Sequence, residues 1–256
     1  MAVENGEWIM HGLDWNDPYR IRTWKELISW INEVGFLPLF ANDVTGFSVE
    51  EHVASGFWWT GNKEHDPWEW REIIAASHEV AYGKFFDKKA GFISLKWLPY
   101  FVNCRRNGYD FDSRWEDGRA TRREKLIMDI LTDTDENGDT LWSDKQILTT
   151  DLKKLAGFGK DGEKNFPGVI TSLMMQTYLV TADFCKRKNK KGDEYGMPVS
   201  ILVPPEALWG YDVVTSAYEE EPMKSWQRVF DRVKMLYPNS AYNDICRLIG
   251  KAPEND

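Results

Sequence analysis

The sequence predicts an α+β fold with a winged helix-turn-helix core, an N-terminal α/β region and C-terminal helices. Between Arg119 and Val203 the hydrophobic patterns follow the order helix, short extended piece, helix, helix, strand, turn, strand, which is the order of a winged helix. The turn between the two strands is strongly basic, and two further helical patterns close the chain. We therefore expect an aromatic-rich α/β region at 1–118, a winged-helix domain at 119–203 and a helical segment at 204–256.

Local patterns predict the elements of the N-terminal region. Residues 23–35 place apolar side chains at helical spacing, and the apolar FLPLF that follows predicts a short buried strand. Ser48 and Glu51 have the spacing of a capping box, and Asp66 before Pro67 is a favourable helix start. Two strands joined by the turn DKKA, and then a helix, are predicted in the segments HEVAYGKFF, GFISL and WLPYFVNCRR.

Three helical segments and a hairpin make up the predicted winged helix. Apolar residues recur at helical spacing in GRATRREKLIMDILTD, SDKQILTTDLKKLAG and GEKNFPGVITSLMMQTYLV, and Ser143 or Thr149 would cap the second of these helices. TYLVTADFCKR and YGMPVSILV predict the two wing strands, and TLWS predicts the short strand that pairs with the wing. Residues 221–236 and 241–249 predict the C-terminal helices.

Charge is distributed unevenly along the chain. The net charge is −9, yet residues 145–200 hold ten Lys and Arg against six Asp and Glu, a balance of +4. A basic segment in an acidic protein indicates where an anionic partner would touch it, and the partner that we predict is DNA. The candidate DNA-contacting side chains lie on the third helix and in the wing turn: Lys164, Asn165, Thr171, Lys186, Arg187, Lys188, Lys190 and Lys191.

Each of these groups also has a simpler interpretation. Lysines at a hairpin tip gain affinity for phosphates through counterion release, but they also keep an exposed hairpin from pairing with other chains. Polar residues at the start of a helix often do no more than face solvent. The tryptophans at positions 58, 59, 68 and 70 would either stack on bases or anchor the hydrophobic core.

The sequence lacks the motifs of many other functional classes. The four histidines share no metal-ligand spacing, and no nucleophile elbow, P-loop or dinucleotide-binding fingerprint is present, so we expect neither a metal nor a cofactor. No apolar run reaches the length of a membrane span, and the N-terminus lacks the pattern of a signal peptide. Three dispersed cysteines favour a reducing cytoplasm over a disulfide scaffold.

Residues 133–144, DTDENGDTLWSD, have nearly the spacing of a calcium-binding loop between two helices. Asp133, Asp135, Asn137 and Asp144 stand at positions 1, 3, 5 and 12. Position 9, however, is a leucine without a side-chain oxygen, position 12 is shorter than the usual glutamate, and no second loop is present to pair with it. We therefore interpret the stretch as an acidic turn between the first two helices of the winged helix.

Four segments resemble those of a known family: GFLPLF, DPWEWRE, AYGKFFDKKAGFISLKWLPYF and LKKLAGFGKDGEKNFPGVITSLMMQTYLV. Over roughly residues 23–215 the chain is similar to bacterial proteins described as AlkZ-related, which are distant relatives of the winged-helix alkylpurine DNA glycosylases. The resemblance implies a winged-helix architecture and contact with DNA. Those glycosylases use a Gln-x-Asp motif whose Asp positions or activates a water. The comparable place here is Gln176-Thr177-Tyr178, where tyrosine replaces the carboxylate.

These observations support three functional hypotheses. The first is a winged helix that binds DNA without catalysis, which the basic wing favours. The second is a DNA-repair enzyme that excises an altered base, for which Glu69, Glu72 and Asp112 are available carboxylates, none of them singled out by its spacing. The third is a degenerate winged helix that makes only protein contacts, which the net charge of −9 favours. A third helix that is accessible beside the wing would favour DNA, and one covered by the acidic N-terminal region would favour protein contacts.

Overall fold

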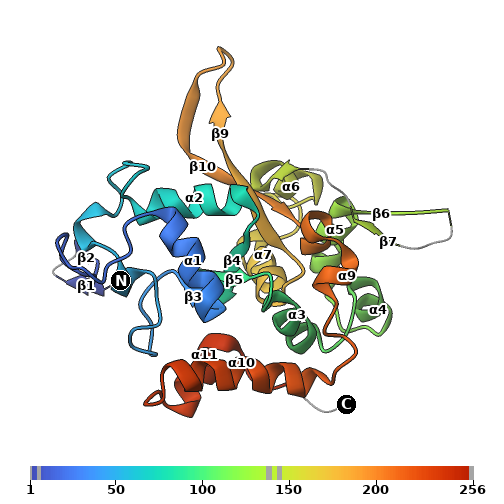
Figure 1. Cartoon of the computed structure of the whole chain (residues 1–256). Coiled ribbons are helices and arrows are strands. Elements are labelled where there is room, and N and C mark those ends of the chain that lie inside the picture. The colour runs from blue at the N-terminus through green and yellow to red at the C-terminus, as the bar shows by residue number, and fades with distance from the viewer. Residues whose placement is uncertain (1, 5–6, 137–139, 143–145, 254–256) are drawn as a thin grey trace.

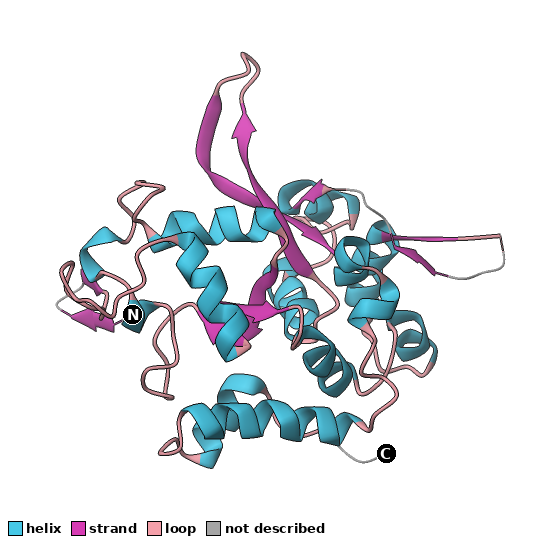
Figure 2. Ribbon diagram, viewed as in Figure 1, coloured by secondary structure: helices cyan, strands magenta, loops and turns pink. Residues whose placement is uncertain are grey.

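The computed structural model of the chain describes residues 2–4, 7–136, 140–142 and 146–253. Helices and strands are mixed along the chain, so the predicted α+β class is confirmed (Figure 1, Figure 2). All the strand pairs in the part of the chain so described are antiparallel. The sheets are small, and helices lie around them.

Most of the N-terminal elements lie close to where the sequence predicts them. The elements are β1 (Ala2–Glu4), β2 (Glu7–Ile9), α1 (Trp24–Val34), β3 (Phe36–Pro38), the 3-10 turns η1 (Glu50–His52) and η2 (Ser55–Phe57), α2 (Pro67–Ser77), β4 (Val80–Phe86), β5 (Lys89–Ser94) and α3 (Leu98–Arg106). Of these, β1, β2 and η2 were not predicted. The strand order of the main sheet here is β3-β5-β4. The Asp66 carboxylate caps α2 by accepting a hydrogen bond from the Trp68 backbone N–H at 2.8 Å, as the Asp-Pro pair predicts.

The capping box predicted at Ser48 starts a single turn and no longer helix. The Glu51 N–H donates to the Ser48 hydroxyl at 3.3 Å, but only η1 follows. The carbonyls of His52 and Val53 accept hydrogen bonds from the backbone N–H groups of Ile21 and Leu13. The chain therefore pairs with the N-terminal segment at the point where a helix would have continued.

The middle of the chain contains the three predicted helices and the two predicted hairpin strands. Its elements are α4 (Phe111–Glu116), α5 (Arg122–Leu131), β6 (Thr132–Thr134), β7 (Thr140–Trp142), β8 (Ile147–Leu148), α6 (Thr149–Leu155), α7 (Phe166–Met175), β9 (Val180–Lys188) and β10 (Glu194–Val203). The second three-stranded sheet has the order β8-β10-β9, and β6 pairs only with β7. The hairpin of β9 and β10 extends away from the body of the molecule (Figure 1).

The prediction that TLWS pairs with the wing was wrong. Thr140–Trp142 forms β7 and pairs with β6, whereas Ile147 and Leu148 pair with Leu202 and Ile201 of β10. A strand that joins this sheet has both faces against the protein, which suits Ile147 and Leu148, while Leu141 of β7 is 50% exposed. Of the two predicted caps of the second helix, Ser143 lies outside the described residues. Thr149 is the first residue of α6 and donates its hydroxyl to the Ser200 carbonyl at 2.6 Å.

The C-terminal helices pack back onto the N-terminal half. They are α8 (Pro205–Trp209), α9 (Tyr211–Val214), α10 (Pro222–Leu236) and α11 (Tyr242–Ile249), and α10 contacts α3 and α11. Their apolar side chains join the hydrophobic core of the N-terminal sheet, while α4 to α7 surround a second core. The base of the hairpin contributes to both cores, since Val180 and Val203 face the first and Leu202 faces the second. Within the described ranges, no helix combines the length and apolar character needed to cross a bilayer.

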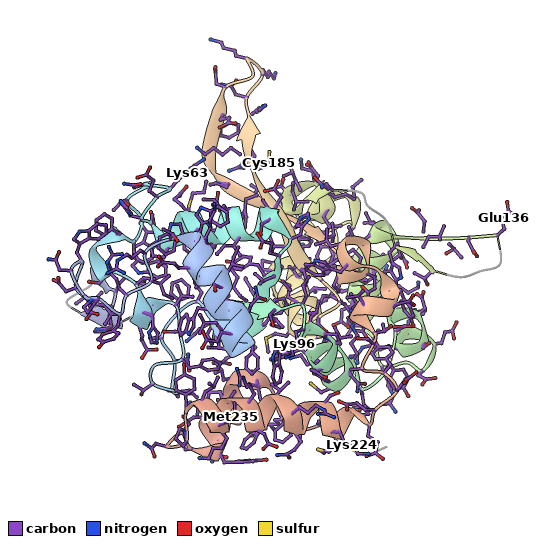
Figure 3. All side chains as sticks on the ribbon, in the orientation of Figure 1. Lys63, Lys96, Glu136, Cys185, Lys224 and Met235 are labelled. Carbon is purple, nitrogen blue, oxygen red and sulfur yellow. The ribbon has the colours of Figure 1, made fainter. Side chains whose placement is uncertain are left out.

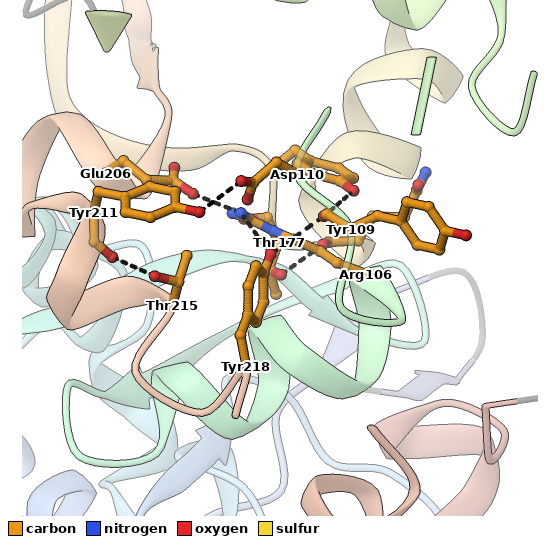
Figure 4. Close-up of polar contacts among 10 residues, drawn as sticks. Arg106, Tyr109, Asp110, Thr177, Glu206, Tyr211, Thr215 and Tyr218 are labelled. Carbon is orange, nitrogen blue, oxygen red and sulfur yellow. Dashed lines mark hydrogen bonds and ion pairs between the residues drawn. The ribbon is translucent and has the colours of Figure 1, made fainter. Parts of the chain in front are cut away.

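A buried ion pair joins segments that are far apart in the sequence (Figure 4). The Arg106 guanidinium, at the end of α3, contacts the Glu206 carboxylate of α8 at 2.5 Å, and both side chains are fully buried. Its second terminal nitrogen donates to the Thr177 carbonyl at 2.8 Å, just before β9. Burial by itself lowers the pKa of Arg106, but the Glu206 carboxylate together with the hydroxyls of Tyr218 and Tyr178 outweighs it, and the pKa is raised above its ordinary value.

We expect Glu206→Gln to destabilise the protein strongly, because it leaves the buried Arg106 without a countercharge. Removing one partner of a buried pair costs about 3 to 5 kcal/mol of unfolding free energy, which urea denaturation would measure. Glu219→Gln, at an exposed position in the same part of the chain, is the matched control and should change stability by less than about 0.5 kcal/mol. Equal stabilities for the two variants would show that the pair does not hold these segments together.

Candidate nucleic-acid interface

The hairpin of β9 and β10 exposes all five cations of the predicted wing tract. Lys186, Arg187 and Lys188 end β9, and Lys190 and Lys191 lie in the turn, all of them exposed. Asn189 orders this turn, because its side-chain oxygen accepts the backbone N–H groups of Lys191 and Asp193 at 2.8 and 3.0 Å. Cations at the end of an ordered hairpin that leaves the protein body can approach phosphates without obstruction (Figure 3).

The pairing of the hairpin is interrupted partway along β10. The register shifts between Tyr195 and Val199, so that Gly196, Met197 and Pro198 have no paired residue on β9. Gly196 adopts a positive φ of 73°, Met197 is 66% exposed, and Pro198 has no backbone N–H to donate. The bulge therefore separates a paired base, which belongs to the core, from a paired tip that carries the cations.

A basic groove lies between the hairpin and α6. It encloses about 860 Å³, and its lining includes Lys153 and Lys154 of α6 together with Lys186, Arg187 and Lys188 of β9. Asp151 is the carboxylate in this lining, and it pairs with Lys154 at 3.2 Å. The positive charge of the hairpin thus continues onto α6. Lys153 and Lys154 were not among the DNA-contacting residues predicted from the sequence. The signal that was available is their exposed position on the helix DLKKLAG.

The predicted contacts on the third helix do not join this groove. The Lys164 ammonium donates to the Gly159 carbonyl at 2.7 Å, and Asn165 is the residue before α7, in a left-handed conformation. The Thr171 hydroxyl donates to the Pro167 carbonyl and is 3.5 Å from the Lys84 ammonium of β4. Strand β4 contacts α7, so the helix that would enter a groove of DNA is partly covered by the N-terminal region.

The residues at the place of the Gln-x-Asp motif take part in two separate polar contacts. The Gln176 amide donates to Glu124 of α5 at 2.9 Å and to the Ser172 hydroxyl at 2.8 Å. Tyr178 is buried, and its hydroxyl donates to the Tyr109 carbonyl at 2.8 Å. A carboxylate is therefore present next to Gln176, but it comes from α5 and lies 52 residues away in the sequence.

The calcium interpretation has no support in the part of the segment that can be described. Asn137 and Asp144 lie outside the described residues, and the described part forms the hairpin of β6 and β7, with Asp133 opposite Leu141. A calcium-binding loop of this spacing lies between two helices. In the described ranges, no three His, Cys, Asp or Glu side chains come together in a way that would hold a metal ion.

These features define an α+β protein that displays a cationic hairpin beside a lysine-bearing helix. The chain belongs to the AlkZ-related family, because the model of that family matches residues 21–250. No curated protein and no solved structure matches the chain.

We expect the contribution of Glu124 to stability to depend on pH. Burial raises the pKa of its carboxyl, but donors from Thr121, Gln176 and Ser172 outweigh this and hold the pKa below its usual value. A carboxyl with a lowered folded-state pKa stabilises the protein above its unfolded pKa, and the stabilisation is lost as the pH falls through the folded value. Glu124→Gln should therefore cost about 1 to 3 kcal/mol at pH 7 and progressively less below about pH 4.

Chemical denaturation at several pH values would measure this difference. Glu116→Gln, at the exposed last residue of α4, is the matched control and should show a small difference at every pH. A Glu124→Gln effect that does not decrease toward low pH would mean that the carboxylate charge has no part in the cluster.

Proposed function

We propose that residues 119–203 form a winged helix that binds duplex DNA through its hairpin and α6, without catalysis. The observation that carries the proposal is the cationic lining of the groove between α6 and β9, in which five Lys and Arg side chains face one carboxylate, with exposed cations beyond it at the hairpin tip. The order α5, β8, α6, α7, β9, β10, with the β6–β7 hairpin inserted after α5, and the sheet order β8-β10-β9 support the winged-helix interpretation.

This arrangement favours phosphate contacts over the reading of base edges. Lysine and arginine side chains that neutralise phosphates give affinity that is independent of sequence and falls steeply with salt. The helix that usually reads bases, α7, contacts β4 and exposes few polar side chains. We therefore expect weak sequence preference, and the net charge of −9 makes strong DNA binding depend on the places where cations cluster.

The cysteines fit a protein of the reducing cytoplasm. Cys104, Cys185 and Cys246 are all free, and Cys185 is exposed in the lining of the basic groove. An exposed free thiol at a binding surface suits a compartment in which thiols stay reduced.

We expect the double variant Lys186→Glu with Lys190→Glu to bind duplex DNA at least about tenfold more weakly at low salt. Each lost phosphate contact should also reduce the salt dependence of log Kd by about one unit. Fluorescence anisotropy with a labelled duplex, measured over a series of salt concentrations, gives both quantities.

The control changes the same total charge elsewhere on the molecule. Lys96 and Lys224 are exposed and lie away from the hairpin, toward the C-terminal helices (Figure 3). Lys96→Glu with Lys224→Glu should keep affinity within about a factor of three, since Coulomb effects at this distance are screened. Equal losses in the two double variants, or no duplex binding by the unmodified protein, would contradict the proposal and favour protein contacts.

A second candidate function is excision of an altered base, and the environment of Glu72 favours it. Glu72 of α2 pairs with Arg71 at 2.9 Å, and burial raises the pKa of its carboxyl, an effect that Arg71 only partly offsets. A carboxyl with a raised pKa is often an acid or base in catalysis, and the partner of Glu72, Arg71, lines a cavity next to α2. Asp112, by contrast, is exposed and accepts a hydrogen bond from Thr140 of β7.

If the protein excises bases through Glu72, Glu72→Gln should reduce base release from an alkylated duplex by about a hundredfold or more. Release of free base from a panel of alkylated duplexes, followed by chromatography, is the measurement. Glu79→Gln, at an exposed position just after α2, should leave the rate unchanged. Absence of base release across the panel would leave DNA binding as the function.

A further inference from the structure

A second cavity lies on the other side of the hairpin base from the basic groove. It encloses about 420 Å³ between α2, the β4–β5 hairpin, α7 and β9, within the range of pockets that hold small ligands. Its lining combines four aromatic rings, those of Phe40, Trp68, Tyr82 and Phe184. Phe40 and Trp68 are only partly buried, so their rings remain available to a ligand.

Arg71 places a buried cation in this aromatic wall. Its guanidinium lies 3.8 Å from the centroid of the Trp68 ring and 4.5 Å from that of Phe184, and the residue is 4% exposed. One terminal nitrogen pairs with Glu72, but the Nε atom is buried and has no hydrogen-bond partner among the described residues. A buried N–H without a partner costs free energy, which a ligand with an acceptor atom would recover.

The rim of the cavity is cationic. Lys84 in β4 and Lys88 and Lys89 at the turn into β5 are exposed and line the opening. Asp87 and Lys88 both adopt positive φ, 46° and 63°, which is the two-residue turn that matches the twist of a hairpin and fixes these lysines beside α7. No described residue of the lining is a carboxylate, so the opening favours an anionic group.

We propose that this cavity binds a nucleotide, with the base against the rings of Phe40 and Trp68 and the phosphate at the lysine rim. Stacking suits any base because every base has a π face, and Arg71 offers a donor to a ring nitrogen or carbonyl. The hydroxyls of Thr181 and Ser200 in the lining add polar groups for the base edge. A free mononucleotide and an unstacked nucleotide in a DNA strand share this chemistry, so the proposal does not depend on the DNA-binding function.

Two fluorescent probes distinguish the two sources. One is the 5′-monophosphate of 2-aminopurine deoxyriboside, and the other is a duplex with 2-aminopurine opposite an abasic site, where the base unstacks readily. Stacking on an aromatic side chain quenches 2-aminopurine, so we expect saturable quenching of at least one probe at low salt. Quenching of the free probe indicates a mononucleotide ligand, and quenching of the duplex probe alone indicates a strand-borne base.

Two variants test whether the quenching arises in this cavity. Ala41 is half-buried in the lining, and the larger side chain of Ala41→Trp should fill the cavity and abolish saturable quenching. Lys84→Glu with Lys89→Glu reverses the rim charge and should weaken binding about tenfold or more, without change in the interior. Lys96→Glu with Lys224→Glu is the control of equal charge and should stay within about a factor of two. The thermal unfolding midpoint shows whether each variant is folded. If Ala41→Trp does not fold, the comparison of Lys84→Glu with Lys89→Glu against the Lys96 and Lys224 control decides the outcome.

The proposals about the cavity and about DNA binding fail in different ways. No quenching of either probe, or quenching that neither variant reduces, would overturn the nucleotide proposal even if plain duplex still binds. Quenching of the free probe with no duplex binding would support the cavity and overturn the DNA-binding function.

Discussion

The hydrogen bond from the Arg106 guanidinium to the Thr177 carbonyl is the interaction on which the junction between α7 and β9 depends. Thr177 adopts a φ of 64°, which a β-branched residue adopts only at a cost of about 1 to 3 kcal/mol. It stands between α7 and β9, and its conformation sets the direction in which β9 leaves the helix. Arg106 donates a hydrogen bond to that carbonyl at 2.8 Å, and Glu206 neutralises the guanidinium (Figure 4). The centroid of the Tyr178 ring lies 4.4 Å from the guanidinium carbon. The direction of the cationic hairpin is therefore set from α3 and α8, about 70 and 30 residues distant in the chain.

Elements with strong local signals could be predicted from the sequence. The Asp66-Pro67 pair and the apolar spacing of α1, α5, α7, α10 and α11 are local properties, and the helices lie where these patterns place them. The pairing of Ile147 and Leu148 with β10 could not be predicted, because two apolar residues before a helix have no local feature that selects their partner strand. The same limit applies to Arg106 and Glu206, which are 100 residues apart in the chain.

The candidate site was partly predictable for a similar reason. Five cations in six residues mark the wing tract in the sequence alone. Lys153 and Lys154 join it only because α6 lies beside β9, which is a tertiary relation. The third-helix residues are polar and lie near the start of the helix, which made them candidates for a DNA contact. Strand β4 contacts that helix, and no feature within the helix reveals such a neighbour.

The bulge at residues 196–198 makes the cationic tip and the hairpin base mechanically distinct parts of one structure. The base is fixed on both faces by core side chains, so its position follows the fold, whereas the tip is joined to it across an unpaired step in β10. The angle at which the tip leaves the body is therefore set by three residues, 196–198, that belong to neither core. Substitutions at that step would change how far the charges extend from the body without altering a side chain of either core.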